Sequence, residues 1–304
     1  MRRTWVWVAA AILLLVAVGV MVGLHSPTST PTTGPRTADA TTPSPTATVT
    51  PTPTPSRIPA APSQETLATL PLAYYDAVIP GLLDGSTVRP ENQWRIATPR
   101  SKLVALYASP AADAAPIATF GATIPTIERP AATAVWGTSA GIDGGMILVS
   151  TPARNRTPGD GGGVDAPSAT FGWARAADFT LTKADRMIRV DVAASKVSIV
   201  GGDGTVSASE QARLGTPADP SPTVTATYLE SDYVDARVTY TEGHPIALTG
   251  AHSPRIPSYG GNSALTALHF YPDPAGSSHG CVRVSAAMTE ALAQLPVGTA
   301  IQFT

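Results

Sequence analysis

The sequence predicts a mainly β protein that has two folded units. Short runs in which apolar and polar residues alternate recur along the chain, and clusters of Gly, Pro, Asp and Ser separate them. One pattern near the C-terminus has helical spacing instead: Met288, Leu292 and Leu295 share a helix face, and Ser285 before them is a favourable N-cap. We therefore expect two β units, the second of which contains one short C-terminal helix.

Composition argues against a nucleic-acid partner. The chain has 304 residues and a formal net charge of −2, and only 14% of its residues are charged. A protein that binds nucleic acid normally carries a basic face, and this chain has no clustered Lys and Arg that would supply one. We expect no nucleic acid among its partners.

The N-terminus is expected to anchor the protein in the cytoplasmic membrane. Arg2 and Arg3 precede an uncharged apolar run from Trp5 to Leu24. A helix of about 20 residues spans the hydrocarbon core of a bilayer, and the two arginines favour a cytoplasmic start. Residues 1–25 are thus predicted to be a single-pass signal anchor, with the catalytic part outside the cell. The alternative is a cleaved signal peptide, for which a mature N-terminus near residues 20–30 would be the evidence.

Residues 26–62 are predicted to be a disordered linker. They consist almost wholly of Thr, Pro, Ser and Ala, as in the run from Thr50 to Pro55. Such a segment has no apolar surface to bury, and it reaches on the order of 100 Å when stretched. It would carry the folded units away from the membrane and into a wall layer.

Residues 63–183 are predicted to form a first β module. A short helix is expected around Gln64–Leu70, and the pattern then changes to strands at Leu103–Tyr107, Ala134–Trp136 and Met146–Val149. The segment Phe171–Arg175, with the Ala176–Phe179 turn after it, resembles the closing strand of bacterial SH3-like modules. We therefore expect a small SH3-like β module here.

Residues 184–304 are predicted to form a β-rich C-terminal domain. Alternating residues in Ile188–Val192 and Val197–Ile199 predict a hairpin that turns at Ala193–Ser195. Further strands are expected at Val224–Tyr228, Val238–Tyr240, Ile246–Leu248, Leu265–His269 and Ile301–Phe303.

The chain has a single cysteine, Cys281, in the run Ser278-His279-Gly280-Cys281-Val282-Arg283. Exported proteins normally pair their cysteines in disulfides, and a lone one has no partner in its own chain. It is therefore either a small buried hydrophobe or a reactive thiol. A thiolate nucleophile needs a lowered pKa, an open approach and donors for the oxyanion that it creates. The amides of Gly280 and Cys281 are candidates for those donors.

Two histidines are candidates for the general base. His269 ends the alternating run that begins at Leu265, so a strand would carry it to the rim of the site. His252 is the rival base. A zinc site made of His252, His269, His279 and Cys281 is a further alternative, but no His-x-x-x-His or Cys-x-x-Cys pair supports it. We expect neither a metal nor a cofactor.

The cysteine motif, the upstream histidine and the short downstream helix resemble the L,D-transpeptidase (YkuD) catalytic domain. The resemblance covers about residues 184–304 and includes Gly215–Pro217 and Leu295–Thr299. An export signal, a Thr/Pro stalk and an SH3-like module are a common arrangement in wall-bound members from high-G+C Gram-positive bacteria. The resemblance implies a mainly β catalytic domain that acts on peptidoglycan stem peptides and is acylated by carbapenems.

The resemblance also implies roles for individual residues. Cys281 would attack the carbonyl of the third stem residue and release the terminal D-alanine, with His269 as the base and the Gly280 and Cys281 amides as oxyanion donors. Ser278 and His279 would shape the turn that carries the nucleophile. Arg283 would bind a substrate carboxylate or pair with an acid.

The reaction implied is transfer to the side-chain amine of a second stem, which gives a 3→3 crosslink, and we expect a monomer. Two alternatives stay open: an L,D-carboxypeptidase that passes the acyl group to water, and an inactive wall-binding protein. The family's upstream histidine is usually followed by glycine and lies farther from the cysteine, whereas here Phe270 follows His269 and the loop is short.

Overall fold

The computed structural model describes residues 58–304, except 143, 161–164 and 274. The predicted anchor at residues 1–25, and the linker at 26–62 apart from its last five residues, lie outside this part of the chain. Within the described residues, no helix has the length and apolar character needed to cross a membrane.

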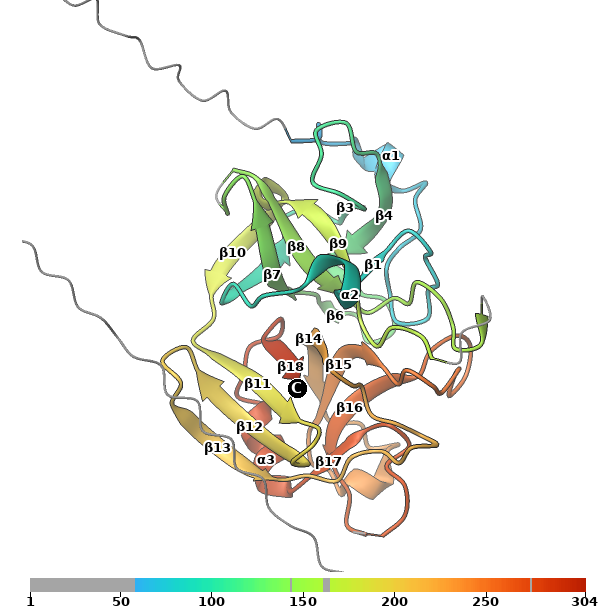
Figure 1. The fold of residues 1–304 in the computed structure, drawn as a ribbon, viewed down its shortest axis with the longest axis vertical. Helices are drawn as coiled ribbons and strands as arrows, with labels where there is room; N and C mark the ends of the chain where they lie inside the picture. The colour runs from blue at the N-terminus through green and yellow to red at the C-terminus, as the bar shows by residue number, and fades with distance from the viewer. Residues whose placement is uncertain (1–57, 143, 161–164, 274) are drawn as a thin grey trace, which may run out of the picture. The chain divides into compact units, whose positions relative to one another are not determined.

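The described residues form two eight-stranded sheets and one two-stranded pair (Figure 1). This confirms the predicted mainly β fold. All of these elements belong to one compact unit, and their side chains share a buried cluster that includes Trp136 and Phe171 of the first β module and Tyr228 and Ala300 of the C-terminal domain.

The sheet of the first β module has the strand order β10-β2-β7-β8-β9-β3-β4, with β1 paired to β9. Strand β8 is buried at every position, because it lies in the interior of the sheet, and this agrees with its run of apolar residues. The elements are α1 (Gln64–Leu67), β1 (Leu83–Asp84), α2 (Gly85–Val88), β2 (Arg95–Pro99), β3 (Leu103–Tyr107), β4 (Pro116–Gly121), the pair β5 (Thr123–Ile124) and β6 (Arg129–Pro130), β7 (Thr133–Ser139), β8 (Met146–Thr151), β9 (Thr170–Arg175), η2 (Ala176–Asp178) and β10 (Phe179–Lys183). The similarity of this module to bacterial SH3-like modules stays a prediction.

The sheet of the C-terminal domain has the order β13-β12-β11-β18-β14-β15-β16-β17. Its last two strands, β16 and β17, run parallel, and they place the cysteine motif at one edge of the sheet. The elements are β11 (Arg186–Asp191), β12 (Lys196–Gly201), β13 (Val206–Gln211), β14 (Thr225–Tyr233), η3 (Thr239–Thr241), β15 (Ile246–His252), β16 (Leu265–Phe270), β17 (Val282–Val284), α3 (Ala286–Leu292) and β18 (Ala300–Phe303). Helix α3 begins after Ser285, whose hydroxyl accepts a hydrogen bond from the Met288 amide, as the capping pattern predicts.

The strand expected at Val238–Tyr240 is wrong, because these residues lead into the 3₁₀ turn η3. The Thr241 hydroxyl donates to the Val238 carbonyl at 2.9 Å and closes the turn on itself. Two alternating residues are too few to distinguish a strand from a turn whose own side chain satisfies its backbone. The turn places the Tyr240 ring 5.4 Å from the His269 ring.

Glu230 is a buried carboxyl group in the irregular part of β14. Its side chain is 3% exposed, and its Oε2 atom has no hydrogen-bond partner among the described residues. Burial raises the pKa of Glu230 to about 8, so the folded protein holds this group mainly as the neutral acid at pH 7.

Replacing Glu230 with glutamine is expected to stabilise the protein at and above neutral pH. The folded pKa is raised, so the folded state binds a proton that the unfolded state releases between about pH 4.5 and 8, and the free energy of unfolding falls as pH rises through that window. Glutamine does not ionise, so the variant lacks this pH dependence of the free energy of unfolding. At pH 7 the variant should be more stable than the wild type by on the order of 1–3 kcal/mol. Urea titrations of both proteins from pH 5 to 8 measure the difference, with exposed Glu91→Gln as the control. A difference that does not change with pH would contradict the burial argument.

Candidate active site

Strands β16 and β17 place Cys281 and His269 on the same face of the sheet. The parallel register pairs Leu268 with Val282 and His269 with Arg283. Leu268 and Val282 both belong to the buried core of the domain. Because side chains alternate along a strand, the neighbours of Val282 face away from that core, together with His269. The predicted base thus lies in β16, and the predicted nucleophile lies directly before β17, the adjacent strand.

The Cys281 thiol is only partly exposed. Burial raises its pKa above the ordinary value, while a backbone hydrogen bond at Ala267 and the positive charge of Arg283 oppose that rise. The lowered pKa expected for a reactive cysteine is therefore absent from the resting structure, because desolvation outweighs both favourable interactions. A nucleophilic role for this thiol would therefore require a base that takes its proton.

His269 has the protonation state that such a base requires. Its Nδ1 lies 2.8 Å from the carbonyl oxygen of Phe270, which acts as an acceptor and so keeps the proton on Nδ1. Burial, followed by the charge of Arg283, lowers the pKa of His269 below its ordinary value, although the Phe270 hydrogen bond raises it in part. The ring is therefore neutral at pH 7, with Nε2 as the nitrogen that can take a proton.

The turn before Cys281 leaves one backbone amide without an internal acceptor in the part of the chain that the structure describes. His279 and Gly280 both have positive φ, 51° and 88°, and the Cys281 amide donates to the Ser278 carbonyl at 3.1 Å. These are the features of a type I′ turn. The Cys281 amide is thus occupied, whereas the Gly280 amide has no acceptor among the described residues. Of the two amides predicted as oxyanion donors, the Gly280 amide is the available one.

Only glycine fits at position 280. An added Cβ there would lie 3.1 Å from the Tyr259 hydroxyl and 3.2 Å from the Pro220 carbonyl, and the positive φ adds strain for any other residue. Tyr259 and Pro220 therefore form the wall beside the nucleophile's turn.

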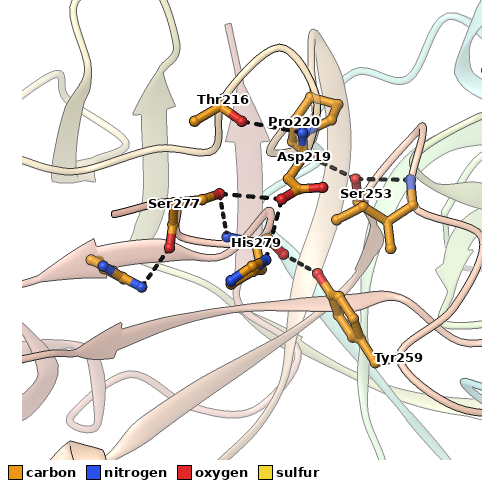
Figure 2. A network of polar contacts seen from close by, with 9 residues as sticks. Thr216, Asp219, Pro220, Ser253, Tyr259, Ser277 and His279 are labelled. Carbon is orange, nitrogen blue, oxygen red and sulfur yellow. Dashed lines mark hydrogen bonds and ion pairs between the residues drawn. The ribbon is translucent and has the colours of Figure 1, made fainter. Parts of the chain in front are cut away.

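His279 is held by Ser277, which is nearby in the sequence, and by Asp219 and Tyr259, which lie far away in it (Figure 2). Its Nδ1 lies 3.2 Å from an oxygen of Asp219, and its backbone amide donates to the Ser277 hydroxyl at 3.1 Å. Its carbonyl accepts a hydrogen bond from the Tyr259 hydroxyl. The imidazole itself is largely exposed, so these contacts orient the turn and leave the ring open to solvent.

Arg283 binds backbone carbonyls in this structure. Its guanidinium donates to Ala275 at 3.1 Å and to Ser277 at 2.6 Å, and it lies 3.9 Å from the centre of the Tyr271 ring. These contacts hold the segment before the cysteine motif. The Ser278 hydroxyl is buried and has no hydrogen-bond partner within the described residues.

His252, the rival base, uses both ring nitrogens inside the protein. Its Nε2 donates to the Pro152 carbonyl at 2.8 Å, and its Nδ1 accepts from the Ala264 amide at 3.2 Å. Burial lowers the pKa of His252 to about 3, and the nearby Arg154 charge adds to that effect. His252 therefore has a structural role. Among the residues that the structure describes, no three His, Cys, Asp or Glu side chains gather as metal ligands.

Residues 185–302 match the model of the L,D-transpeptidase catalytic domain family, YkuD. This part of the chain, 118 of its 304 residues, is similar to the YkuD L,D-transpeptidase catalytic domain. The family match confirms the resemblance that the cysteine motif predicts. No curated protein matches the sequence significantly.

Solved L,D-transpeptidases are among the structures similar to this chain. The C442S mutant of the Enterococcus faecium enzyme is 20% identical with a TM-score of 0.28. The match covers 40% of this chain and about half (53%) of that protein. L,D-transpeptidase 1 from Mycobacterium tuberculosis is 15% identical with a TM-score of 0.28, over 44% of this chain and 77% of its own. L,D-transpeptidase 3 from the same organism, in complex with a faropenem-derived adduct, is 12% identical with a TM-score of 0.32. The match covers 57% of this chain and 91% of that one. Similarities at this level add no support to the family match.

Sequence reasoning missed three groups around the turn: Asp219, Tyr259 and the Pro220 carbonyl. They come from two loops, and Asp219 and Tyr259 lie 60 and 20 residues before His279, in Pro- and Gly-rich segments that have no periodic pattern. A local sequence signal for them does not exist, because it is the fold that brings these loops together.

Proposed function

We propose that this protein is a cysteine-dependent L,D-transpeptidase that forms 3→3 crosslinks between peptidoglycan stem peptides. One observation carries the proposal: within a YkuD domain, Cys281 and His269 share a sheet face beside the available Gly280 amide. Together they make up a nucleophile, a base and an oxyanion donor, which is the set that acyl transfer needs.

In the first half-reaction, the Cys281 sulfur bonds to the carbonyl carbon of the third stem residue. His269 Nε2 takes the thiol proton, and the Gly280 amide donates to the oxyanion. When the tetrahedral intermediate collapses, the bond to the terminal D-alanine nitrogen breaks, and His269 returns the proton to that leaving amine. The product is a thioester on Cys281.

In the second half-reaction, the side-chain amine of another stem attacks the thioester carbon. His269 takes a proton from the attacking amine, the carbon–sulfur bond breaks, and the proton returns to the Cys281 sulfur. A thioester favours amines over water as attacking groups, and this suits transfer better than hydrolysis.

Mass spectrometry of the purified protein with a disaccharide tetrapeptide tests the proposal. We expect an adduct on Cys281 that has the mass of the donor without its terminal D-alanine, followed by a crosslinked dimer. Release of the tripeptide alone would make the protein a carboxypeptidase instead. With neither adduct nor product, the proposed catalysis would be wrong and a wall-binding role would replace it.

A further inference from the structure

The Tyr259 hydroxyl holds the peptide bond between His279 and Gly280. It donates to the His279 carbonyl, and that peptide is the central one of the type I′ turn. A trans peptide is planar, so its carbonyl and its N–H point in opposite directions. By fixing the carbonyl of residue 279, Tyr259 also fixes the direction of the Gly280 N–H.

This peptide needs such an anchor. Rotating the central peptide of a type I′ turn gives a type II′ turn, in which the second central residue no longer has a positive φ. Gly280 accepts either sign of φ at little cost. The turn could therefore move between the two forms, and the Gly280 N–H would point toward the substrate in only one of them.

The first β module holds the loop that carries Tyr259. Arg154 is 1% exposed and donates to the carbonyls of Ile256 and Ser253, at 2.9 and 3.4 Å. Asp165 binds Arg255 through both of its carboxylate oxygens, at 2.9 and 3.1 Å.

Two more contacts extend this attachment to both ends of the loop. The Ala166 amide donates to the Pro254 carbonyl at 2.8 Å, and the Asn262 side chain donates to the Asp76 carbonyl at 3.2 Å. The loop from His252 to Asn262 is thus bound to the first β module along its length, while its Tyr259 reaches the catalytic turn.

We propose that Tyr259 is a positioning residue for the Gly280 oxyanion donor, and that Arg154 of the first β module holds Tyr259 in place. The first β module then helps to position the active-site turn, in addition to packing beside the C-terminal domain. The inference rests on the proposed function, because it assigns the Gly280 amide to the oxyanion of acyl transfer.

Two reactions of the same thiol test the proposal in the full-length protein. Acylation by a carbapenem forms an oxyanion, whereas alkylation by iodoacetamide requires the thiolate but no oxyanion donor. Intact-mass measurements give both rate constants at pH 7. Tyr259→Phe is expected to slow acylation by about 10- to 100-fold, less than the roughly 100- to 1,000-fold cost of removing an oxyanion donor outright, because the Gly280 amide stays in place but loses its fixed direction; alkylation should stay within about twofold.

Two further variants complete the test. Tyr75→Phe, which removes a phenolic hydroxyl from the first β module, should leave both rates unchanged. Arg154→Met should slow acylation selectively, and Arg154→Lys, which keeps a donor, should restore part of the loss. If Arg154→Met does not fold, Tyr259→Phe still decides the matter.

Two results would overturn the inference: acylation of Tyr259→Phe at the wild-type rate, or an equal loss of acylation and alkylation, since the latter would place the effect on the thiol itself. A wild-type protein that the carbapenem acylates but a stem peptide does not would refute the proposed substrate and leave this test intact.

Discussion

Replacing Cys281 with alanine is expected to abolish acyl transfer from a disaccharide tetrapeptide and to remove the carbapenem adduct. The chain has no other thiol, so no second group can take over the thioester chemistry. The change removes one small, partly exposed side chain, and the melting temperature should shift by no more than about 2–4 °C. Intact-mass spectrometry and thermal unfolding of the same preparation measure both effects.

Cys281→Ser is the matched variant, because it keeps the size of the side chain and replaces the thiol with a much less acidic hydroxyl. It should bind the same donor and give a far slower acylation, if any is measurable. Crosslinking by Cys281→Ala at the wild-type rate would show that the nucleophile lies elsewhere.

Replacing His269 with glutamine is expected to slow acylation at pH 7 by on the order of 10²–10⁴-fold, the usual contribution of a general base. The effect should be large because burial raises the pKa of Cys281, so little thiolate forms without a base. Wild-type acylation should also fall as pH drops below 6.5, through the lowered pKa of His269, since protonated imidazole cannot accept a proton. Stopped-flow rates from pH 5 to 8 should show this acid limb in the wild type and its loss in the variant.

His252→Gln provides the comparison. Its two hydrogen bonds are internal, to Pro152 and Ala264, so the change should lower the melting temperature and leave the shape of the pH profile as it is. If His252→Gln removed the acid limb and His269→Gln kept it, the two histidines would exchange roles.

Much of this protein follows from its sequence alone. An apolar run predicted the strand at Leu103–Tyr107, alternating residues predicted the hairpin from Ile188 to Ile199, and Ser285 predicted the start of α3. These signals are local, because a strand or a helix start depends on residues within a few positions of each other. The cysteine motif identified the catalytic family for the same reason, since the turn and its nucleophile are contiguous in the chain.

The arrangement of the active site depended on the tertiary structure. His252 and His269 looked like rival bases in the sequence, and the choice between them came from strand register and from which ring nitrogens the fold leaves available. The raised pKa of the Cys281 thiol likewise comes from desolvation, which the folded chain imposes on it. Tyr259 contacts the turn across 20 positions of chain, and Arg154 contacts Ile256 in the loop of Tyr259 across 102 positions; no local pattern records such contacts, because only folding makes these residues neighbours.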